Sequence, residues 1–130
     1  MRLMFFSIER EKQKGNESYR VGDINEAIMC YSRSIEMDPK NSILYANRAM
    51  GYLKIESLEK AEEDCNLALE YDCTYVKAWS RRGLTRFKRG KYSQVCVCIK
   101  RTSSKFTFDI THHIPQELKI EISPRKLPQY

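Results

Sequence analysis

Apolar residues recur along this chain at the three-to-four-residue spacing of amphipathic helices. The clearest run extends from Ile24 to Ile35, and Ser7 is the expected N-cap of an earlier helix. Polar turns such as Gly22-Asp23 separate the runs, and Pro39 ends one of them because proline cannot continue a helix interior. The pattern predicts helices at about residues 8–21, 24–37, 42–55, 58–70 and 75–88.

The same pattern indicates which faces are buried. The third helix is apolar on more than one side, as suits a helix packed between neighbours. The fourth helix is expected to turn Ala61 and Cys65 inward and its acidic residues outward. The fifth is expected to bury Val76, Trp79 and Leu84.

A fixed interval of 34 residues relates the helices to one another. Gly15, Ala49 and Gly83 are spaced at this interval, and so are Ala27 and Ala61. Small residues let two helix backbones approach closely, and a repeat of this length is typical of stacked helix-turn-helix units. The sequence therefore predicts an all-α array of antiparallel helix pairs.

The repeat weakens towards the C-terminus. Val95 stands where earlier repeats have alanine, and its branched side chain is expected to push the helices apart. Residues 92–101 fit either a short sixth helix or an extended segment. We expect an N-terminal extension at 1–7, repeats at 8–41, 42–75 and 76–101 (the last incomplete), and a poorly ordered tail at 102–130. Because about three repeats are needed to bury a continuous core, these two and a half are expected to be marginally stable or to depend on a partner.

Charge and cysteine content narrow the possible classes. The chain has 23 basic and 17 acidic residues, with the basic excess between residues 75 and 91 and the acidic excess between 56 and 72. This separation suggests an acidic ligand on one side rather than general affinity for nucleic acid. Five cysteines without disulfide-framework spacing favour a reduced, cytoplasmic setting. The apolar start is too short for a signal peptide and no run is long enough to cross a membrane, so a soluble protein is expected.

Five polar residues fall at positions expected to face one groove. Lys12 and Asn16 are four residues apart, as are Lys77 and Arg81, so each pair shares a helix face. Asn47 lies 34 residues before Arg81 and occupies the same column of the array. The cations attract an anion, arginine donates two hydrogen bonds to a carboxylate, and the asparagine amides fix the ligand backbone. The sequence therefore predicts a carboxylate-binding groove.

The segments that carry these residues resemble the dicarboxylate-clamp tetratricopeptide domains of chaperone cofactors. They read Lys-Gln-Lys-Gly-Asn at 12–16, Tyr-Ala-Asn-Arg-Ala at 45–49 and Lys-Ala-Trp-Ser-Arg-Arg-Gly at 77–83, within a resemblance that covers about residues 9–94. The resemblance implies a right-handed superhelical stack. It also implies a co-chaperone adaptor that binds the C-terminal Glu-Glu-Val-Asp peptide of heat-shock protein 90 or heat-shock protein 70, within a larger chaperone–client assembly.

The resemblance assigns roles to individual residues. Lys12, Asn16, Asn47, Lys77 and Arg81 would hold the terminal carboxylate and the aspartate side chain of such a peptide. Tyr19, Met50 and Lys54, further along the same face, would meet its upstream residues.

Two other functions stay open from the residues alone. One is a scaffold that grips a partner helix without needing a free carboxylate. The other is RNA binding by the basic fifth helix, although a solvated basic helix facing the acidic fourth is the favoured interpretation of those charges. Cys96, Cys98 and the His112-His113 pair make a poor zinc site, since their spacing is too tight. The sequence contains no nucleophile–base pair, phosphate loop or paired carboxylates, so no enzyme, cofactor or metal is expected.

Overall fold

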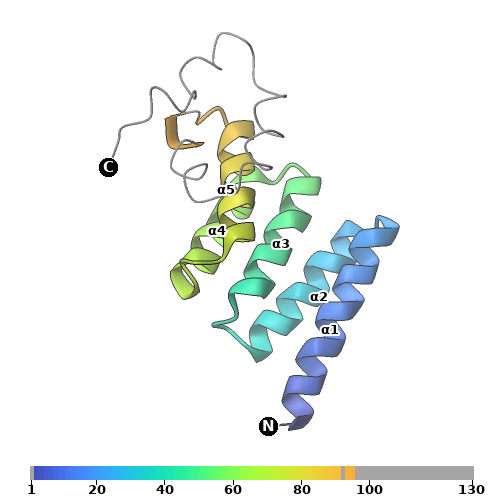
Figure 1. The fold of residues 1–130 in the computed structure, drawn as a ribbon. Coiled ribbons are helices and arrows are strands. Elements are labelled where there is room, and N and C mark those ends of the chain that lie inside the picture. Colours follow the sequence, from blue (N-terminus) through green and yellow to red (C-terminus); the bar gives the residue numbers. More distant parts are fainter. Residues whose placement is uncertain (1, 92, 96–130) are drawn as a thin grey trace.

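The computed structural model describes residues 2–91 and 93–95, and successive helices in that part run antiparallel (Figure 1). The helices are α1 (Arg2–Val21), α2 (Ile24–Met37), α3 (Ser42–Lys54), α4 (Leu58–Tyr71) and α5 (Val76–Lys88). The pairs α1–α2 and α3–α4 make the most extensive contacts, and α2 on α3 and α4 on α5 join the pairs into one array. The predicted all-α helix-turn-helix array is confirmed.

Local chemistry sets the helix ends close to the predicted residues. The side chain of Asp23 accepts a hydrogen bond from the Glu26 amide and so caps α2, while Asn41 caps α3 in the same way through the Ile43 amide. Gly90 follows α5 with a positive φ of 75°, a conformation that glycine adopts without steric cost. The four helices from α2 to α5 therefore begin and end within one residue of their predicted bounds.

The predicted start of the first helix was wrong. The helix α1 begins at Arg2 rather than after Ser7, so residues 2–7 of the expected extension are helical. No glycine or proline interrupts this segment, and a serine does not end a helix whose upstream residues can continue it. This added segment makes few packing contacts, as the exposed fractions of Leu3, Phe5 and Phe6 show: 84%, 70% and 67%.

Small residues let the helices approach closely. A Cβ added at Gly15 would lie 2.8 Å from Cε1 of Tyr31, and one added at Gly51 would lie 2.7 Å from Cγ1 of Ile28. Ala27, Ala49 and Ala61 are completely buried along the same contacts. The main core cluster lies between α2, α3, α4 and α5 and consists of Ile35, Leu44, Tyr45, Ala46, Ala68, Leu69 and Ala78.

The helix α5 and the residues after it differ in part from the prediction. Val76 was expected to be buried but is 48% exposed, because the helix face that α5 buries carries Ala78, Gly83 and Thr85. Trp79 and Leu84 are partly buried. Val95 is fully buried and residues 93–95 are helical. The rest of the expected sixth segment and the tail at 102–130 lie outside the described residues.

The acidic residues of α4 do not all face outward as predicted. Asp64 and Glu62 are only 3% and 6% exposed, because arginines from neighbouring helices need them as partners. Arg48 donates to both oxygens of Asp64, at 2.7 and 2.8 Å, and also to the hydroxyl of Ser32 at 3.2 Å. This one guanidinium of α3 therefore links α2 to α4.

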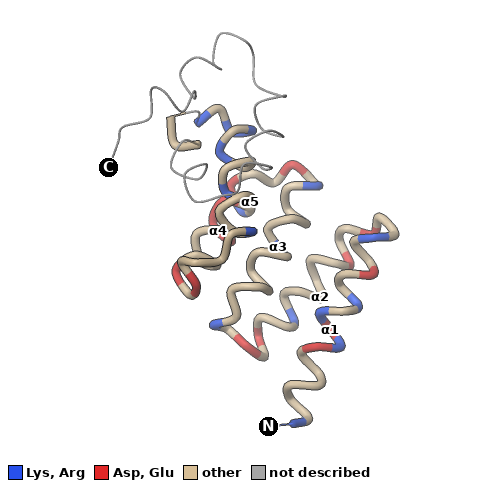
Figure 2. Tube along the Cα trace, in the orientation of Figure 1, with Lys and Arg blue, Asp and Glu red and all other residues tan. Residues whose placement is uncertain are grey.

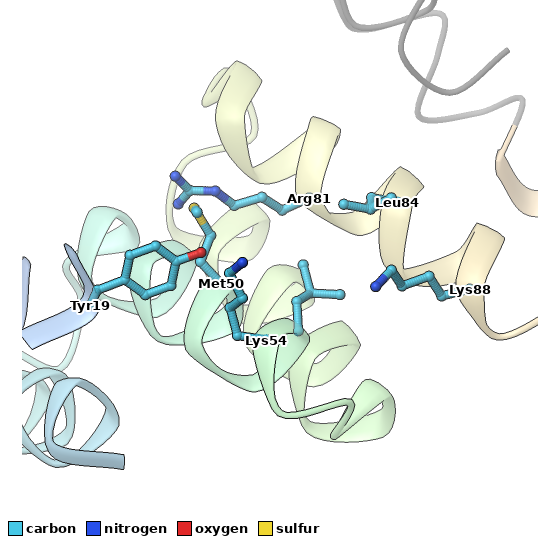
Figure 3. Close-up of a pocket in the computed structure, with 7 residues that line it drawn as sticks. Tyr19, Met50, Lys54, Arg81, Leu84 and Lys88 are labelled. Carbon is cyan, nitrogen blue, oxygen red and sulfur yellow. The ribbon is translucent and has the colours of Figure 1, made fainter. Parts of the chain in front are cut away.

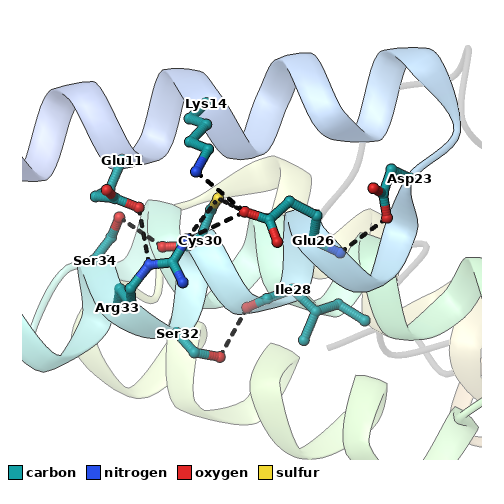
Figure 4. A network of polar contacts seen from close by, with 9 residues as sticks. All are labelled: Glu11, Lys14, Asp23, Glu26, Ile28, Cys30, Ser32, Arg33 and Ser34. Carbon is teal, nitrogen blue, oxygen red and sulfur yellow. Dashed lines mark hydrogen bonds and ion pairs between the residues drawn. The ribbon is translucent and has the colours of Figure 1, made fainter.

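A second polar network joins α1 to α2 on the outside of the array (Figure 4). Arg33 donates to Glu11 on α1 and to Glu26 on its own helix, and Lys14 of α1 reaches Glu26 at 3.2 Å. These side chains are partly exposed, so each pair contributes little to stability. Together they fix which face of α1 lies against α2.

Mutation of the buried Arg48–Asp64 pair should change the free energy of unfolding more than mutation of the partly exposed ion pairs around Arg33. Asp64→Ala leaves a largely desolvated guanidinium unpaired, and we expect it to lower the free energy of unfolding by about 3–5 kcal/mol. The double variant Arg48→Met/Asp64→Leu removes both charges and should recover all but about 1 kcal/mol of that loss. Urea unfolding followed by circular dichroism measures both, and equal losses in the two variants would contradict the assignment.

Candidate functional site

Two adjoining pockets lie on the face formed by α1, α3 and α5, and Figure 3 shows the outer one. The inner pocket, of about 180 Å³, is lined by Asn16, Tyr19, Tyr31, Asn47, Met50 and Arg81. The outer pocket, of about 240 Å³, is lined by Tyr19, Met50, Leu53, Lys54, Arg81, Leu84 and Lys88. The pockets share three residues, one from each of the three helices, and form one continuous groove.

Arg81 is the half-buried cation at the junction of the two pockets. Its Nη1 donates to Oδ1 of Asn47 at 3.3 Å, but it makes no ion pair with any residue that the structure describes. Arg48 and Arg86, of comparable burial, each pair with a carboxylate of α4. Burial lowers the pKa of Arg81, yet a guanidinium stays protonated at physiological pH. A desolvated cation without a counter-charge favours an incoming anion.

The two asparagines of the inner pocket each have one amide oxygen engaged. Tyr31 donates its hydroxyl proton to Oδ1 of Asn16 at 2.6 Å, and Arg81 donates to Oδ1 of Asn47. The NH₂ group of each amide is therefore the part left for a ligand. The inner pocket presents hydrogen-bond donors around a positive charge, which suits a carboxylate.

The structure brings together most, but not all, of the residues singled out from the sequence. Asn16, Asn47 and Arg81 line the inner pocket. Tyr19 and Met50 line both pockets and Lys54 lines the outer one. Lys12 and Lys77 line neither, and Lys12 is held on its own helix by Glu9 at 2.9 Å. The exposed Lys77 lies one turn before Arg81 on α5.

Sequence reasoning missed four lining residues: Tyr31, Leu53, Leu84 and Lys88. The repeat interval carries the signal for three of them, since Leu53, Leu84 and Lys88 lie 34 residues after Tyr19, Met50 and Lys54 respectively. Tyr31 has no such signal. It belongs to α2, not to a groove-lining helix, and the equivalent residue of the next repeat is a cysteine.

Three basic residues at the C-terminal end of α5 and just beyond it face a buried carboxylate of α4 rather than an open surface. Arg86 and Lys91 donate to Glu62 at 3.0 and 3.3 Å, and Arg89 also pairs with it. Figure 2 shows the basic segment of α5 beside the acidic segment of α4. This arrangement favours the interpretation of a basic helix facing an acidic one over RNA binding.

Other chemistry finds little support in the described part of the chain. No cluster of three or more His, Cys, Asp or Glu side chains there is fit to hold a metal ion. The residues of the weak zinc motif, Cys96, Cys98, His112 and His113, lie outside the described residues. Among the helices that the structure describes, none combines the length and apolar character needed to cross a bilayer.

The chain is similar to known helical-repeat proteins. The sequence profile of the tetratricopeptide repeat matches residues 13–41. Human RNA polymerase II-associated protein 3 is 46% identical over 83 residues, which make up 64% of this chain but only 12% of that protein, so the chain spans a small part of its relative's length.

Two solved structures extend the likeness over the array. The second tetratricopeptide repeat domain of Spaghetti (RPAP3), bound to the HSP90 peptide SRMEEVD, is 38% identical to this chain, with a TM-score of 0.73. The match covers 78% of this chain and 95% of that one. The second tetratricopeptide repeat domain of human RPAP3, in complex with the HSP70 peptide SGPTIEEVD, is 34% identical to this chain, with a TM-score of 0.72. The match covers 96% of this chain and 99% of that one.

The Glu62 cluster gives the array a predictable response to acid. Burial raises the pKa of Glu62, but the hydrogen bonds from Arg86, Arg89 and Lys91 outweigh it and hold the pKa below the ordinary value of 4.5. The ionised carboxylate therefore stabilises the fold above about pH 4.5, and that contribution is lost as the pH falls through the lowered pKa.

We expect Glu62→Gln to lower the free energy of unfolding by about 2 kcal/mol at pH 7 and by progressively less below pH 4.5. Chemical unfolding of both proteins between pH 3 and 7 measures the difference. A difference that is constant over this range would contradict the role of the charge.

Proposed function

Because the chain belongs to the tetratricopeptide repeat family, we propose that it is an adaptor that binds the acidic C-terminal peptide of a heat-shock chaperone in its groove. The observation that carries the proposal is the half-buried Arg81, without a carboxylate partner among the described residues, beside the amides of Asn16 and Asn47. The similar domains of Spaghetti and human RPAP3 hold peptides that end in Glu-Glu-Val-Asp. The proposed ligands are therefore the C-termini of heat-shock protein 90 and heat-shock protein 70.

In this proposal each element of the groove has a distinct task. Arg81 donates two parallel hydrogen bonds to the terminal carboxylate, and the NH₂ groups of Asn16 and Asn47 donate to the same group and to the peptide backbone. Lys12 and Lys77 add charge at the mouth of the groove. The exposed pair between Lys12 and Glu9 contributes little, so a ligand carboxylate competes for that lysine readily.

The outer pocket would receive the residues that precede the terminal aspartate. Met50, Leu53 and Leu84 supply an apolar floor, and Lys54 and Lys88 supply cations. A few charge-assisted hydrogen bonds, less the cost of ordering the peptide, correspond to micromolar affinity, or about −8 kcal/mol. Such an affinity suits a transient partner.

The wider role follows from the binding activity. We propose that the chain acts without catalysis, in the cytoplasm where these chaperones work, and within a larger chaperone–client assembly. Glu62 engages three of the cations that RNA binding would need, Arg86, Arg89 and Lys91. The charged groove favours a free carboxylate over an apolar partner helix.

A peptide titration tests the proposal directly. The peptide Met-Glu-Glu-Val-Asp with a free C-terminus should bind with micromolar affinity, whereas the same peptide with a C-terminal amide should bind at least about tenfold more weakly. Affinity for the free acid should also fall as salt is raised, because charged groups carry the recognition. Isothermal titration calorimetry measures both effects.

Neighbouring arginines on α5 provide matched variants for this titration. Arg81→Ala should weaken binding of the free acid by about tenfold to a hundredfold, the range expected for charge-assisted hydrogen bonds. Arg82→Ala should leave the affinity unchanged, since Arg82 stacks on Trp79 and donates to Asn66 away from the groove. Equal affinity for the acid and amide peptides, or equal effects of the two variants, would refute the clamp.

A further inference from the structure

We propose that Tyr31 is the positioning residue that makes the inner pocket prefer a carboxylate to a carboxamide. This inference rests on the proposed function, since it concerns how the same pocket recognises the end of its ligand. Tyr31 lies on α2, is only 3% exposed, and reaches the pocket from behind the groove-lining helices.

A hydrogen bond from Tyr31 orients the Asn16 amide. The hydroxyl of Tyr31 donates to Oδ1 of Asn16 at 2.6 Å, a short hydrogen bond between α2 and α1. Turning the Asn16 amide over would place its NH₂ group against the hydroxyl and exchange its oxygen into the pocket. A tyrosine hydroxyl can also accept, but turning the amide over would take from the hydroxyl proton of this buried residue the acceptor that it has in the structure, so Asn16 offers N–H donors to the ligand.

The Asn47 amide beside it is oriented as well. Arg81 fixes the Asn47 amide in the same sense, because its Nη1 donates to Oδ1 of Asn47 at 3.3 Å. Asn16, Asn47 and Arg81 then present N–H donors together. A carboxylate offers only acceptors to such a set, whereas the NH₂ group of a carboxamide brings donors against donors. The pocket discriminates between the two ends through the orientation of its amides.

Tyr31 reaches the inner pocket through the space beside Gly15. A Cβ at Gly15 would lie 2.8 Å from Cε1 and 3.0 Å from Cδ1 of Tyr31, so the ring occupies the space that the missing side chain leaves. In the next repeat the equivalent pair is Ala49 and Cys65, a larger residue against a smaller one. The first repeat thus has glycine with tyrosine where the second has alanine with cysteine, and of these two only the tyrosine carries a hydroxyl.

The hydroxyl is a dependable donor. Burial raises the pKa of Tyr31 to about 12, although the positive charge of Arg81 acts in the opposite direction. The phenol therefore stays protonated across the physiological range. Ionisation of the phenol therefore does not break the bond to Asn16 near neutral pH.

Two variants remove the hydroxyl by different routes. Tyr31→Phe keeps the ring and loses only the bond to Asn16. The double variant Gly15→Ala/Tyr31→Cys gives the first repeat the packing pair of the second, and so separates the missing hydroxyl from a packing defect. Tyr45→Phe is the matched control, because the Tyr45 hydroxyl donates to the Pro39 carbonyl at 2.8 Å, outside the groove.

The measurement is the ratio of the affinities for the free-acid and amidated peptides. We expect both Tyr31 variants to weaken binding of the free acid by about tenfold and to leave the amide unchanged, so that the ratio falls about tenfold. Tyr45→Phe should keep the wild-type ratio. In an Asn16→Ala background, Tyr31→Phe should cause no further loss, because its effect passes through Asn16.

The outcomes distinguish this inference from the proposed function. A wild-type chain that prefers the free acid, together with Tyr31 variants that keep the same ratio, overturns the role of Tyr31 alone. A full effect of Tyr31→Phe in the Asn16→Ala background overturns it as well. A wild-type chain that binds neither peptide overturns both proposals.

Discussion

Close approach between helix backbones is the constraint on which the rest of this structure depends. Where Gly15 meets Tyr31 and Gly51 meets Ile28, no room remains for another carbon atom. These contacts fix the rotation of each helix about its own axis. They therefore decide that the polar positions of α1, α3 and α5 face one groove, which no single helix could achieve alone.

The charges of the array divide according to the same geometry. Arg48 and Arg86 face the outer helix α4, where they pair with Asp64 and Glu62 and are neutralised within the fold. Arg81 faces the groove instead, and the residues of its column in the earlier repeats are Gln13 and Asn47, neither of which is acidic. The positive character of the groove thus comes less from a concentration of cations than from the lack of a carboxylate along one column.

Much of this arrangement was predictable from the sequence, because helical periodicity and the 34-residue interval both act over long stretches. They gave the bounds of α2 to α5 and brought Asn16, Asn47 and Arg81 to one face. The buried acids of α4 were mispredicted, since a pattern of polar positions cannot reveal that Arg48 will cross to Asp64. The α1 start was missed because helix propensity continued upstream of the expected cap. Tyr31 falls within the apolar run from Ile24 to Ile35, but its hydroxyl acts at a contact between two helices that only the structure reveals.

The order in which the helices touch has a mechanical consequence. Each helix packs mainly on its neighbours in the chain, and α3 stands between α1 and α5. The curvature of such a stack is set by the angles between neighbouring helices. A ligand that spans Asn16, Asn47 and Arg81 would contact α1, α3 and α5 at once. Binding of the ligand and the curvature of the array would then be coupled.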